Sequence, residues 1–557
     1  MPRFVRPVAV LTGVMLAAST LAPGTSGADE AELPEPVTAG ALPAPQTDGT
    51  VFAITIVGDT VFAGGRFDTA RPYGEAPGGP GEVERHNLLA FDLHTGELLD
   101  WAPEVTGSEF SSSDGSLAAW CTETGEDRWV CDSVFDLEAD PSGGSLYVAG
   151  DFDRIDGQWR SRIAEFDITA GELTDFDPAP NARVRSLSVT GEGVYFGGNF
   201  TTVGGEDRWR LAAADRDGEV LDWAPAVNRE VWSVLAAPEL DRVLLGGRFS
   251  EVNGESRQGM AAVDVGAGDS VPWEAEVPGG GEVITDIVTD GSGTAWLSAY
   301  DFGSGSERFE GRMAADIVTG EAHWWDGCYG DSFDAAVADG VLYSVSHAHD
   351  CTASGAIPER GADFRYFRLL AQTTDARGEA ERDRNHVNRG DPVPEFLPWF
   401  PNTNSGPEDS YFRQGTWAID TDGDYVVVGG EFTGVNTHSR DSQQQQSLTR
   451  FAARGMPDAV NNGPQFPFPA PRLSRTFPIL GSPVIRWNTT WNAQQGAMTY
   501  QVMRDGTDEP IHEVTIESRP WDRPQERYVD REVRSGTYWI RVIDADGEVL
   551  NSPRSSL

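Results

Sequence analysis

One short motif, Gly-Gly-x-Phe, recurs along this chain and constrains its fold more than any other feature. In the best-preserved copy, two alternating strand patterns lead into the motif, and the strand Leu-Ala-Ala-Ala-Asp and a closing Trp-x-Pro follow it. Unaltered copies begin at Gly64, Gly197, Gly246 and Gly429, and degenerate copies begin at Ala149 and Ala299. A unit repeated at roughly 50 residues indicates an architecture built from equivalent β-sheets.

Each repeat has the pattern of a four-stranded antiparallel sheet. Alternating apolar and polar residues indicate strands, and the Gly-rich links between them suit tight hairpins. With residues 346–350 in the place of a missing motif, the chain contains seven units. Units of this length without helical periodicity are typical of a β-propeller, so we predict an all-β chain with a seven-bladed propeller over residues 50–455. An open β-solenoid is the alternative, although its rungs are shorter than these units.

The repeated residues have physical roles in such a fold. Paired glycines let a neighbouring backbone approach closely, and the recurrent Phe and Trp fill the wedge between adjacent sheets. Together with the Leu-Ala-Ala-Ala-Asp strand, they make residues 50–455 resemble the delta-sixty repeat of bacterial secreted proteins and, more distantly, kelch propellers. The resemblance implies an architecture. It supplies no catalytic residues, since proteins of this kind are largely without an assigned reaction.

The pattern changes near residue 470. Alternating strands separated by turns continue to the end of the chain, over the length of a small sandwich domain. The strands that contain Trp487, Tyr500 and Tyr538 resemble strands B, C and F of a fibronectin type III domain, with Tyr538 as a candidate tyrosine-corner residue. We therefore predict an immunoglobulin-like, fibronectin type III β-sandwich over residues 470–557, joined to the propeller by a linker at residues 456–469.

The N-terminal residues predict export. Two arginines precede an apolar run and small residues, so residues 1–28 have the pattern of a signal peptide and the mature protein is expected to be secreted. Residues 29–49 are acidic and Pro-rich and are expected to form a linker. No later segment approaches the roughly 20 apolar residues that a membrane span needs.

The charge of the chain excludes one class of partner. The sequence has 88 acidic and 42 basic residues, a formal net charge of -46, and no lysine. Nucleic acids and anionic lipids are recognised by clustered Lys and Arg, so nucleic-acid binding is excluded. Codon bias in a GC-rich genome and adaptation of the surface to salt would both explain the missing lysine.

The four cysteines form two local pairs along the sequence. Cys121 lies close to Cys131, and Cys328 lies close to Cys351. Three pairings are formally possible, and we predict the two local disulfides because near neighbours meet most often and an exported chain meets an oxidising environment. Free thiols are the alternative, and no Cys-x-x-Cys spacing favours zinc.

The predicted innermost strands share a position that is small or acidic in every repeat. The aligned residues are Ala53, Asp136, Ser186, Ser233, Asp286, Asp334 and Ala418. This position would face a narrow central channel, where Asp136, Asp286 and Asp334 could bind a hard cation such as Ca²⁺ through oxygen ligands. In the alternative interpretation, the position is merely small and solvated.

One position earlier, the same strands carry mostly large side chains. These residues are Phe52, Phe135, Arg185, Trp232, Thr285, Phe333 and Trp417. If they lie at a channel mouth, Arg185, Trp232 and Trp417 could stack against a glycan or an extended peptide. Strict strand alternation would instead turn most of them into the core between blades.

Two further patterns are weaker. His347 and His349 lie two apart on one strand face, with Asp350 beside them, which is half of a transition-metal site or a structural feature of a degenerate blade. The Asp-Gly sequences at residues 420–425 and 544–548 lack the later bidentate Glu of a calcium loop and are interpreted as turns.

No residue set in the chain has the spacing of a catalytic signature. The first hypothesis is a secreted, non-catalytic binding protein that recognises a glycan, a peptide or a surface partner through a propeller face. The alternatives are an extracellular carbohydrate-active enzyme of the glycoside hydrolase or lyase type, and a structural spacer of a surface assembly. The enzyme alternative rests on architecture alone.

Overall fold

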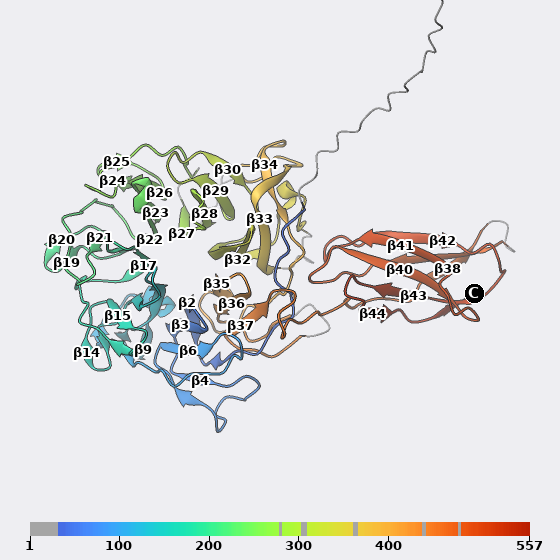
Figure 1. Cartoon of the computed structure of the whole chain (residues 1–557), viewed down its shortest axis with the longest axis horizontal. Coiled ribbons are helices and arrows are strands. Elements are labelled where there is room, and N and C mark those ends of the chain that lie inside the picture. Colours follow the sequence, from blue (N-terminus) through green and yellow to red (C-terminus); the bar gives the residue numbers. More distant parts are fainter. Residues whose placement is uncertain (1–31, 278–280, 302–308, 360–365, 437–441, 477–480) are drawn as a thin grey trace, which may run out of the picture. The chain divides into compact units, whose positions relative to one another are not determined.

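Seven antiparallel sheets follow one another along the chain in the computed structural model, which describes residues 32–277, 281–301, 309–359, 366–436, 442–476 and 481–557 (Figure 1). The predicted signal peptide lies outside the described residues. The innermost strands are β2 (Thr50–Val57), β11 (Val134–Ala139), β17 (Val184–Val189), β22 (Val231–Ala237), β27 (Glu282–Thr289), β31 (Ser332–Ala338) and β35 (Thr416–Thr421). No α-helix occurs among these residues.

Each sheet continues outward from its innermost strand through a hairpin. The second strands are β3 (Thr60–Arg66), β12 (Ser145–Gly150), β18 (Val194–Gly198), β23 (Arg242–Gly247), β28 (Thr294–Asp301), β32 (Val341–Ala348) and β36 (Tyr425–Gly430). The third are β6 (Leu88–Asp92), β15 (Ile163–Asp167), β21 (Leu211–Ala214), β26 (Met260–Val263), β29 (Arg312–Asp316), β33 (Phe367–Glu379) and β37 (Leu448–Ala452). Three sheets have a fourth strand, namely β16 (Glu172–Leu173), β30 (Ala322–Trp325) and β34 (Pro392–Phe396).

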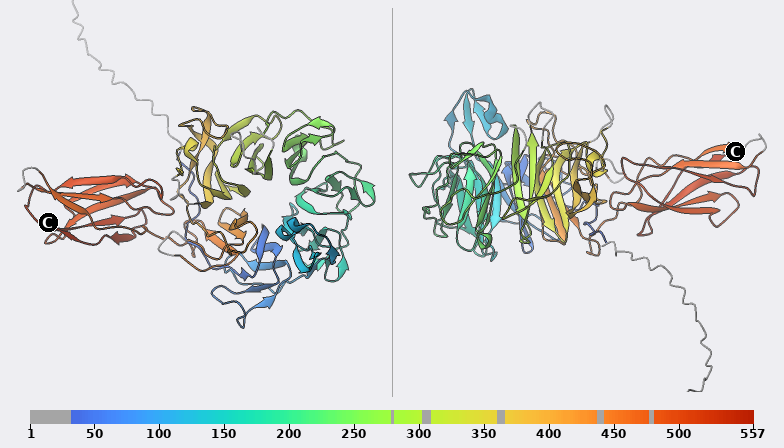
Figure 2. Two further views of the ribbon diagram at one scale, coloured as in Figure 1. Left: turned by 180° about the vertical axis from the view of Figure 1, so that it is seen from behind. Right: turned by 90° about the horizontal axis from the view of Figure 1, so that it is seen from above.

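The sheets form a closed ring. Every innermost strand contacts the innermost strand of the next sheet, and the last one, β35, contacts the first, β2. The ring of blades surrounds a central axis (Figure 2). The predicted seven-bladed β-propeller is therefore confirmed over the described residues.

The Gly-Gly pair has a specific steric reason. A Cβ atom on the first glycine, Gly197, would lie 2.5 Å from the Cγ1 atom of Val231, which belongs to the innermost strand of the next blade. A Cβ atom on the second, Gly198, would lie 2.1 Å from the carbonyl oxygen of Arg183 in its own blade. The first glycine thus allows neighbouring blades to pack, and the second allows the hairpin to close.

The recurrent aromatic residues lie between blades, as predicted. Phe200 and Phe249 of the motif are fully buried. Trp101 packs edge-on between Phe62 of the first blade and Phe166 of the second, with ring centroids 5.1 Å apart in both pairs. These rings supply much of the apolar area that holds adjacent blades together.

The segment before β2 completes the seventh blade. The Thr38 amide donates to the Ala452 carbonyl and the Leu42 amide to the Arg450 carbonyl, each at 2.8 Å, so the segment pairs with the outer edge of β37. Val37 is buried beside it. Residues 37–47 are therefore part of the propeller, whereas the sequence predicted a linker over residues 29–49, because a Pro-rich composition does not reveal pairing with a strand 400 residues away.

The C-terminal residues form two facing sheets. One contains β38 (Arg472–Arg475), β39 (Pro483–Asn488) and β42 (Gln525–Val529). The other contains β40 (Ala497–Arg504), β41 (His512–Glu517), β43 (Thr537–Ile543), β44 (Val549–Asn551) and β45 (Ser555–Ser556). Trp487, Tyr500 and Tyr538 are buried between them, as expected of a β-sandwich.

Tyr538 donates its hydroxyl to the carboxylate of Asp530 at 2.9 Å, eight residues upstream. A tyrosine corner bonds to upstream backbone instead, so the specific fibronectin type III likeness stays a prediction. In the described part of the chain, no helix is long and apolar enough to cross a membrane.

Candidate binding site in the central channel

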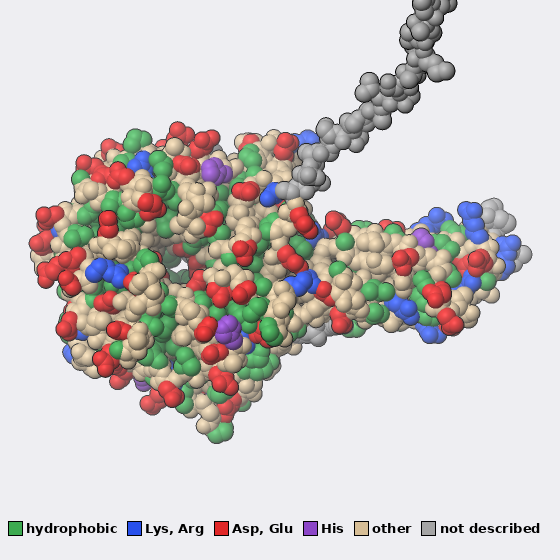
Figure 3. Space-filling view, viewed as in Figure 1, with side chains coloured by type: hydrophobic (Ala, Val, Ile, Leu, Met, Phe, Trp, Pro, Cys, Tyr) green, Lys and Arg blue, Asp and Glu red, His purple; other side chains and the backbone are tan. Residues whose placement is uncertain are grey.

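A cavity of about 440 Å³ lies on the propeller axis, with all seven innermost strands in its wall. Figure 3 shows the propeller face hollowed at this point. The wall includes every residue of the predicted large ring and carboxylates from four blades. The predicted ligand-binding residues Arg185, Trp232 and Trp417 therefore lie in one cavity.

A β-bulge in each innermost strand explains why two consecutive residues face the channel. The pairing register of all seven strands shifts across one residue, and these seven residues are Phe52, Phe135, Arg185, Trp232, Thr285, Phe333 and Trp417. A bulge inserts one extra residue and re-aims its side chain. The interpretation from strict alternation, which placed most of this ring between blades, is therefore wrong.

The ring of bulged residues is closed by Trp120, which belongs to an insertion between the first and second blades. Trp120 follows a 3-10 turn, η1 (Gly115–Ala119), and precedes the disulfide between Cys121 and Cys131. The ring of Trp120 contacts five other aromatic rings. The distances between ring centroids are 4.9 Å to Phe412, 5.5 Å to Phe135, 5.8 Å to Phe52, 6.1 Å to Trp417 and 6.2 Å to Trp232.

Arg185 lies among these rings. Its guanidinium carbon is 4.1 Å from the ring centroids of both Trp120 and Trp232 and 4.6 Å from that of Phe135. Its Nε atom lies 3.3 Å from Glu230 Oε1. Burial lowers the pKa of Arg185 to about 10, so the side chain is cationic at neutral pH.

Two hydrogen-bond donors in this wall are buried and have no acceptor among the described residues. They are Nη2 of Arg185 and Nε1 of Trp417. The two residues are 8% and 7% exposed. Buried polar atoms of this kind are uncommon in folded proteins and call for an explanation.

The small or acidic position performs a structural task. Innermost strands have one unpaired edge, whose N–H groups need acceptors. Asp136 Oδ2 accepts the Leu187 amide at 2.6 Å, and Ser186 Oγ accepts the Val234 amide at 3.0 Å. Each acceptor belongs to the blade before its donor.

The same arrangement recurs farther around the ring. Asp286 accepts the Ala335 amide at 3.2 Å, and Asp334 accepts the Ile419 amide at 2.9 Å. Two residues farther along the innermost strand of the last blade, Asp420 accepts the Ile56 amide of the first blade at 2.8 Å. These side chains therefore join successive blades.

Burial also shifts the ionisation of these carboxyls. It raises the pKa of Asp136 to about 7 and those of Asp286 and Asp420 to about 6. Burial raises the pKa values of Glu138 and Asp334 well above the usual range, and the charges of Asp136 and Asp286, respectively, add to the effect. The channel is thus partly protonated near neutral pH.

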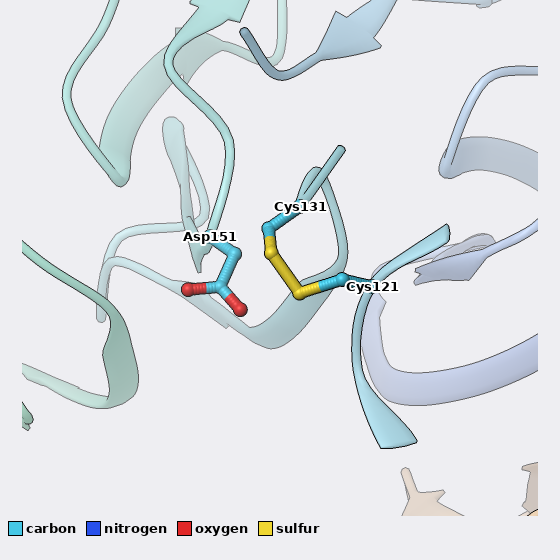
Figure 4. A group of neighbouring side chains, drawn as sticks. All are labelled: Cys121, Cys131 and Asp151. Carbon is cyan, nitrogen blue, oxygen red and sulfur yellow. A yellow bond between two sulfur atoms is a disulfide. The ribbon is translucent and has the colours of Figure 1, made fainter. Parts of the chain in front are cut away.

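The carboxylates predicted to bind calcium do not form a compact ligand set. In the described residues, the one group of three or more possible ligands within 4.8 Å of one another is Cys121, Cys131 and Asp151, and its sulfurs are joined in a disulfide (Figure 4). Asp136, Asp286 and Asp334 are instead bonded to backbone amides. Calcium binding stays a prediction that this geometry does not favour.

The histidine pair has neighbours of another kind. His347 Nδ1 lies 2.7 Å from Gln414 Oε1, and burial lowers the His347 pKa to about 4. Asp350 pairs with Arg384 and accepts a hydrogen bond from Thr352. These contacts support the structural interpretation of this blade.

Both predicted disulfides are present. Cys121 is bonded to Cys131, and Cys328 is bonded to Cys351. Trp120 was missed as a site residue, because nothing in the repeat pattern assigns it a place. Its position directly before a short disulfide loop was the available signal, since such a loop holds its neighbours rigidly.

Comparisons with known proteins agree with the fold. A family model described as a β-propeller domain of unknown function matches residues 144–167, which include β12 and β15. No curated protein sequence matches the chain.

Two solved structures are similar at 10% sequence identity. One is a chain in the crystal structure of a mitotic checkpoint complex, with a TM-score of 0.38 and coverage of 79% of this chain and 99% of that chain. The other is the Neurospora crassa Pan2 WD40 domain, with a TM-score of 0.31 and coverage of 65% and 86%. At this similarity, neither structure bears on function.

Proposed function

We propose that the protein is a secreted, non-catalytic binding protein whose central channel accepts a cationic side chain of a peptide or protein partner. The observation that carries the proposal is the convergence of five carboxyl groups in one cavity of about 440 Å³. They are Asp136, Glu138, Asp286, Asp334 and Asp420. An ammonium or guanidinium group entering the cavity would favour their ionised forms.

The arrangement favours binding over catalysis. Glycoside hydrolysis needs two carboxyl groups free to act as acid and as base or nucleophile. Here Asp136 accepts the Leu137 and Leu187 amides on its two oxygens, and Asp420 accepts the Thr421 and Ile56 amides in the same way. Groups held in this manner are suited to a fixed electrostatic wall.

The proposal of export rests on residues 1–28 and agrees with the two disulfides, which persist in oxidising compartments. N-terminal sequencing of protein recovered from culture medium should give a start near Asp29. A chain retained in the cell with an intact N-terminus would contradict export.

Binding of a fluorescent tri-arginine peptide to the full chain tests the proposed partner class. The double variant Asp136→Ser with Asp420→Ser should bind at least about tenfold more weakly, since serine keeps a hydrogen-bond acceptor but removes two charges. The matched control is Asp59→Ser with Asp217→Ser, which removes two exposed carboxylates.

Equal binding by both double variants would mean that the peptide senses only the overall negative charge. That result would refute recognition in the channel. No binding by the unaltered chain would favour the structural spacer.

A further inference from the structure

We propose that the aromatic wall around Arg185, which lines the same cavity as the carboxylates, is a binding site for a tryptophan or similar aromatic residue of a peptide, and that Trp120 fills this site from within the same chain. The inference goes beyond the cationic-peptide function, because it needs none of the channel carboxylates. It rests on the contacts of Trp120, on the insertion that carries it, and on the two unpaired donors.

Trp120 occupies the site as a ligand would. Its ring lies over the Arg185 guanidinium at 4.1 Å, and Trp232 covers the same guanidinium at 4.1 Å, so the cation lies between two indoles. Cation–π contact of this kind is a common means of recognising an aromatic group. The remaining ring contacts come from Phe412 and from Phe52, Phe135 and Trp417.

The segment that carries Trp120 is an addition to the propeller and belongs to no blade. It contains the small sheet of β8 (Phe110–Ser111), β10 (Arg128–Val130) and β9 (Thr122–Gly125), which projects from one propeller face in Figure 2. Withdrawal of Trp120 would leave the strands of every blade paired. The ring can therefore leave the site without unfolding its scaffold.

Few polar contacts hold this segment down. Arg66 Nη1 donates to the carbonyl of Cys121 at 3.0 Å, and Ser133 Oγ donates to the carbonyl of Trp120 at 2.7 Å. Arg66 Nη1 also donates to the Ala118 carbonyl at 3.4 Å, and the Ser108 amide donates to Asp153 Oδ2 at 3.0 Å. Bonds such as that from Trp129 Nε1 to the Ser112 carbonyl at 2.9 Å lie within the segment itself. The ring contacts of Trp120 are thus a principal interaction between this segment and the propeller. The Cys121–Cys131 disulfide keeps the segment compact.

The two unpaired donors indicate what the internal occupant lacks. Trp120 covers the face of Arg185 but accepts no hydrogen bond from Arg185 Nη2 or from Trp417 Nε1. A peptide would bring an aromatic ring together with backbone carbonyl groups, which are the acceptors these donors need. A tryptophan-bearing peptide therefore fits both the apolar and the polar features of the site.

Competition with Trp120 is testable on the full chain. The probe is a fluorescent, amidated hexapeptide, Leu-Ala-Ala-Trp-Ser-Thr, which copies residues 117–122 with serine for Cys121. The Trp120→Ala variant should bind it at least about tenfold more tightly than the unaltered chain, because internal occupancy reduces the apparent affinity of an external ligand. Trp159→Ala, which removes an exposed ring outside this site, should match the unaltered chain.

Two further measurements separate this site from the acidic channel. Adding Arg185→Met to Trp120→Ala should abolish binding of the hexapeptide and leave tri-arginine binding intact or stronger. The same hexapeptide with alanine in place of tryptophan should not bind. With these two measurements, a result that contradicts the aromatic site can be distinguished from one that contradicts the proposed cationic-peptide function.

A second variant covers the case in which Trp120→Ala does not fold. Cys121→Ser with Cys131→Ser keeps Trp120 but loosens its segment, so its affinity for the hexapeptide should lie between those of the unaltered chain and an open site. The proposal is overturned if the folded variants bind the hexapeptide no more tightly than the unaltered chain, or if the alanine peptide binds equally well. Trp120 would then be a core residue.

Discussion

At the scale of single residues, the channel shows one structural task performed by two kinds of side chain. Asp136 and Ser186 both accept an amide of the next blade. The Ser186 hydroxyl accepts its hydrogen bond without carrying a charge, whereas the Asp136 carboxylate is a charged group that must be buried. Burial raises the pKa of Asp136 to about 7, so this residue makes stability depend on pH.

The sign of that dependence follows from the direction of the shift. The folded state holds the Asp136 proton more tightly than the unfolded state, whose carboxyl has the ordinary pKa of 3.8. The stabilising contribution is therefore complete below pH 4 and is lost as the pH rises through about 7. Between pH 6 and pH 8 this residue should lower the free energy of unfolding by about 1 kcal/mol.

Asp136→Ser should make the pH profile flatter in that interval, because serine supplies the acceptor and does not ionise. Urea unfolding of both proteins at pH 6 and pH 8 measures the difference. An equal loss of stability in the two proteins would show that Asp136 does not titrate there.

At the scale of the β-strand, the bulge and the Gly-Gly pair depend on each other. The bulge at Arg185 moves its side chain toward the channel, and the carbonyl of Arg183 then approaches Gly198. No side chain fits at that glycine. The position of the repeated Gly-Gly motif in the sequence therefore indicates where each innermost strand departs from regular pairing.

Gly198→Ala tests this account. Its Cβ atom would lie 2.1 Å from a backbone oxygen, so the free energy of unfolding should fall by at least about 2 kcal/mol. Gly191→Ala is the matched control, since its Cβ would meet no atom within 4 Å. Comparable denaturation midpoints for the two variants would contradict the steric role of Gly198.

The strand scale also explains what could be predicted from the sequence. Repeat spacing and alternation predicted the propeller and the sandwich, and the closeness of the cysteines along the chain predicted both disulfides. Strict alternation predicted the wrong side-chain direction for Trp232 and Trp417, because a bulge adds one residue and reverses that direction. Trp120 could not be placed, since its partners come from strands distant in sequence.

At the scale of the whole molecule, ring closure depends on the chain before the first blade. Leu42 and Thr38 pair with the exposed edge of β37, and the Val37 amide donates to the Tyr343 hydroxyl at 2.9 Å. Without this segment, β37 would present an unpaired edge. The seventh blade is thus completed by residues from the opposite end of the propeller sequence.

A chain that begins at Gln46 should therefore be less stable than one that begins at Pro34. We expect its melting temperature to be at least about 5 °C lower and its tendency to self-associate to be greater. Adding a peptide of residues 34–45 should restore part of the loss by occupying the edge of β37. Identical melting of the two chains, measured by circular dichroism, would argue against a role in closure.

The seam at the seventh blade also determines how the ring would respond to tension. Thr38 lies opposite Ala452, so the start of the closing segment and the end of β37 are adjacent. Force applied between Pro34 and the sandwich would pull the closing segment away from β37 and break their hydrogen bonds one after another. The other six blades would bear no force until these bonds had broken. A propeller anchored through both ends would yield at this seam, and at a lower force than its melting temperature alone would suggest.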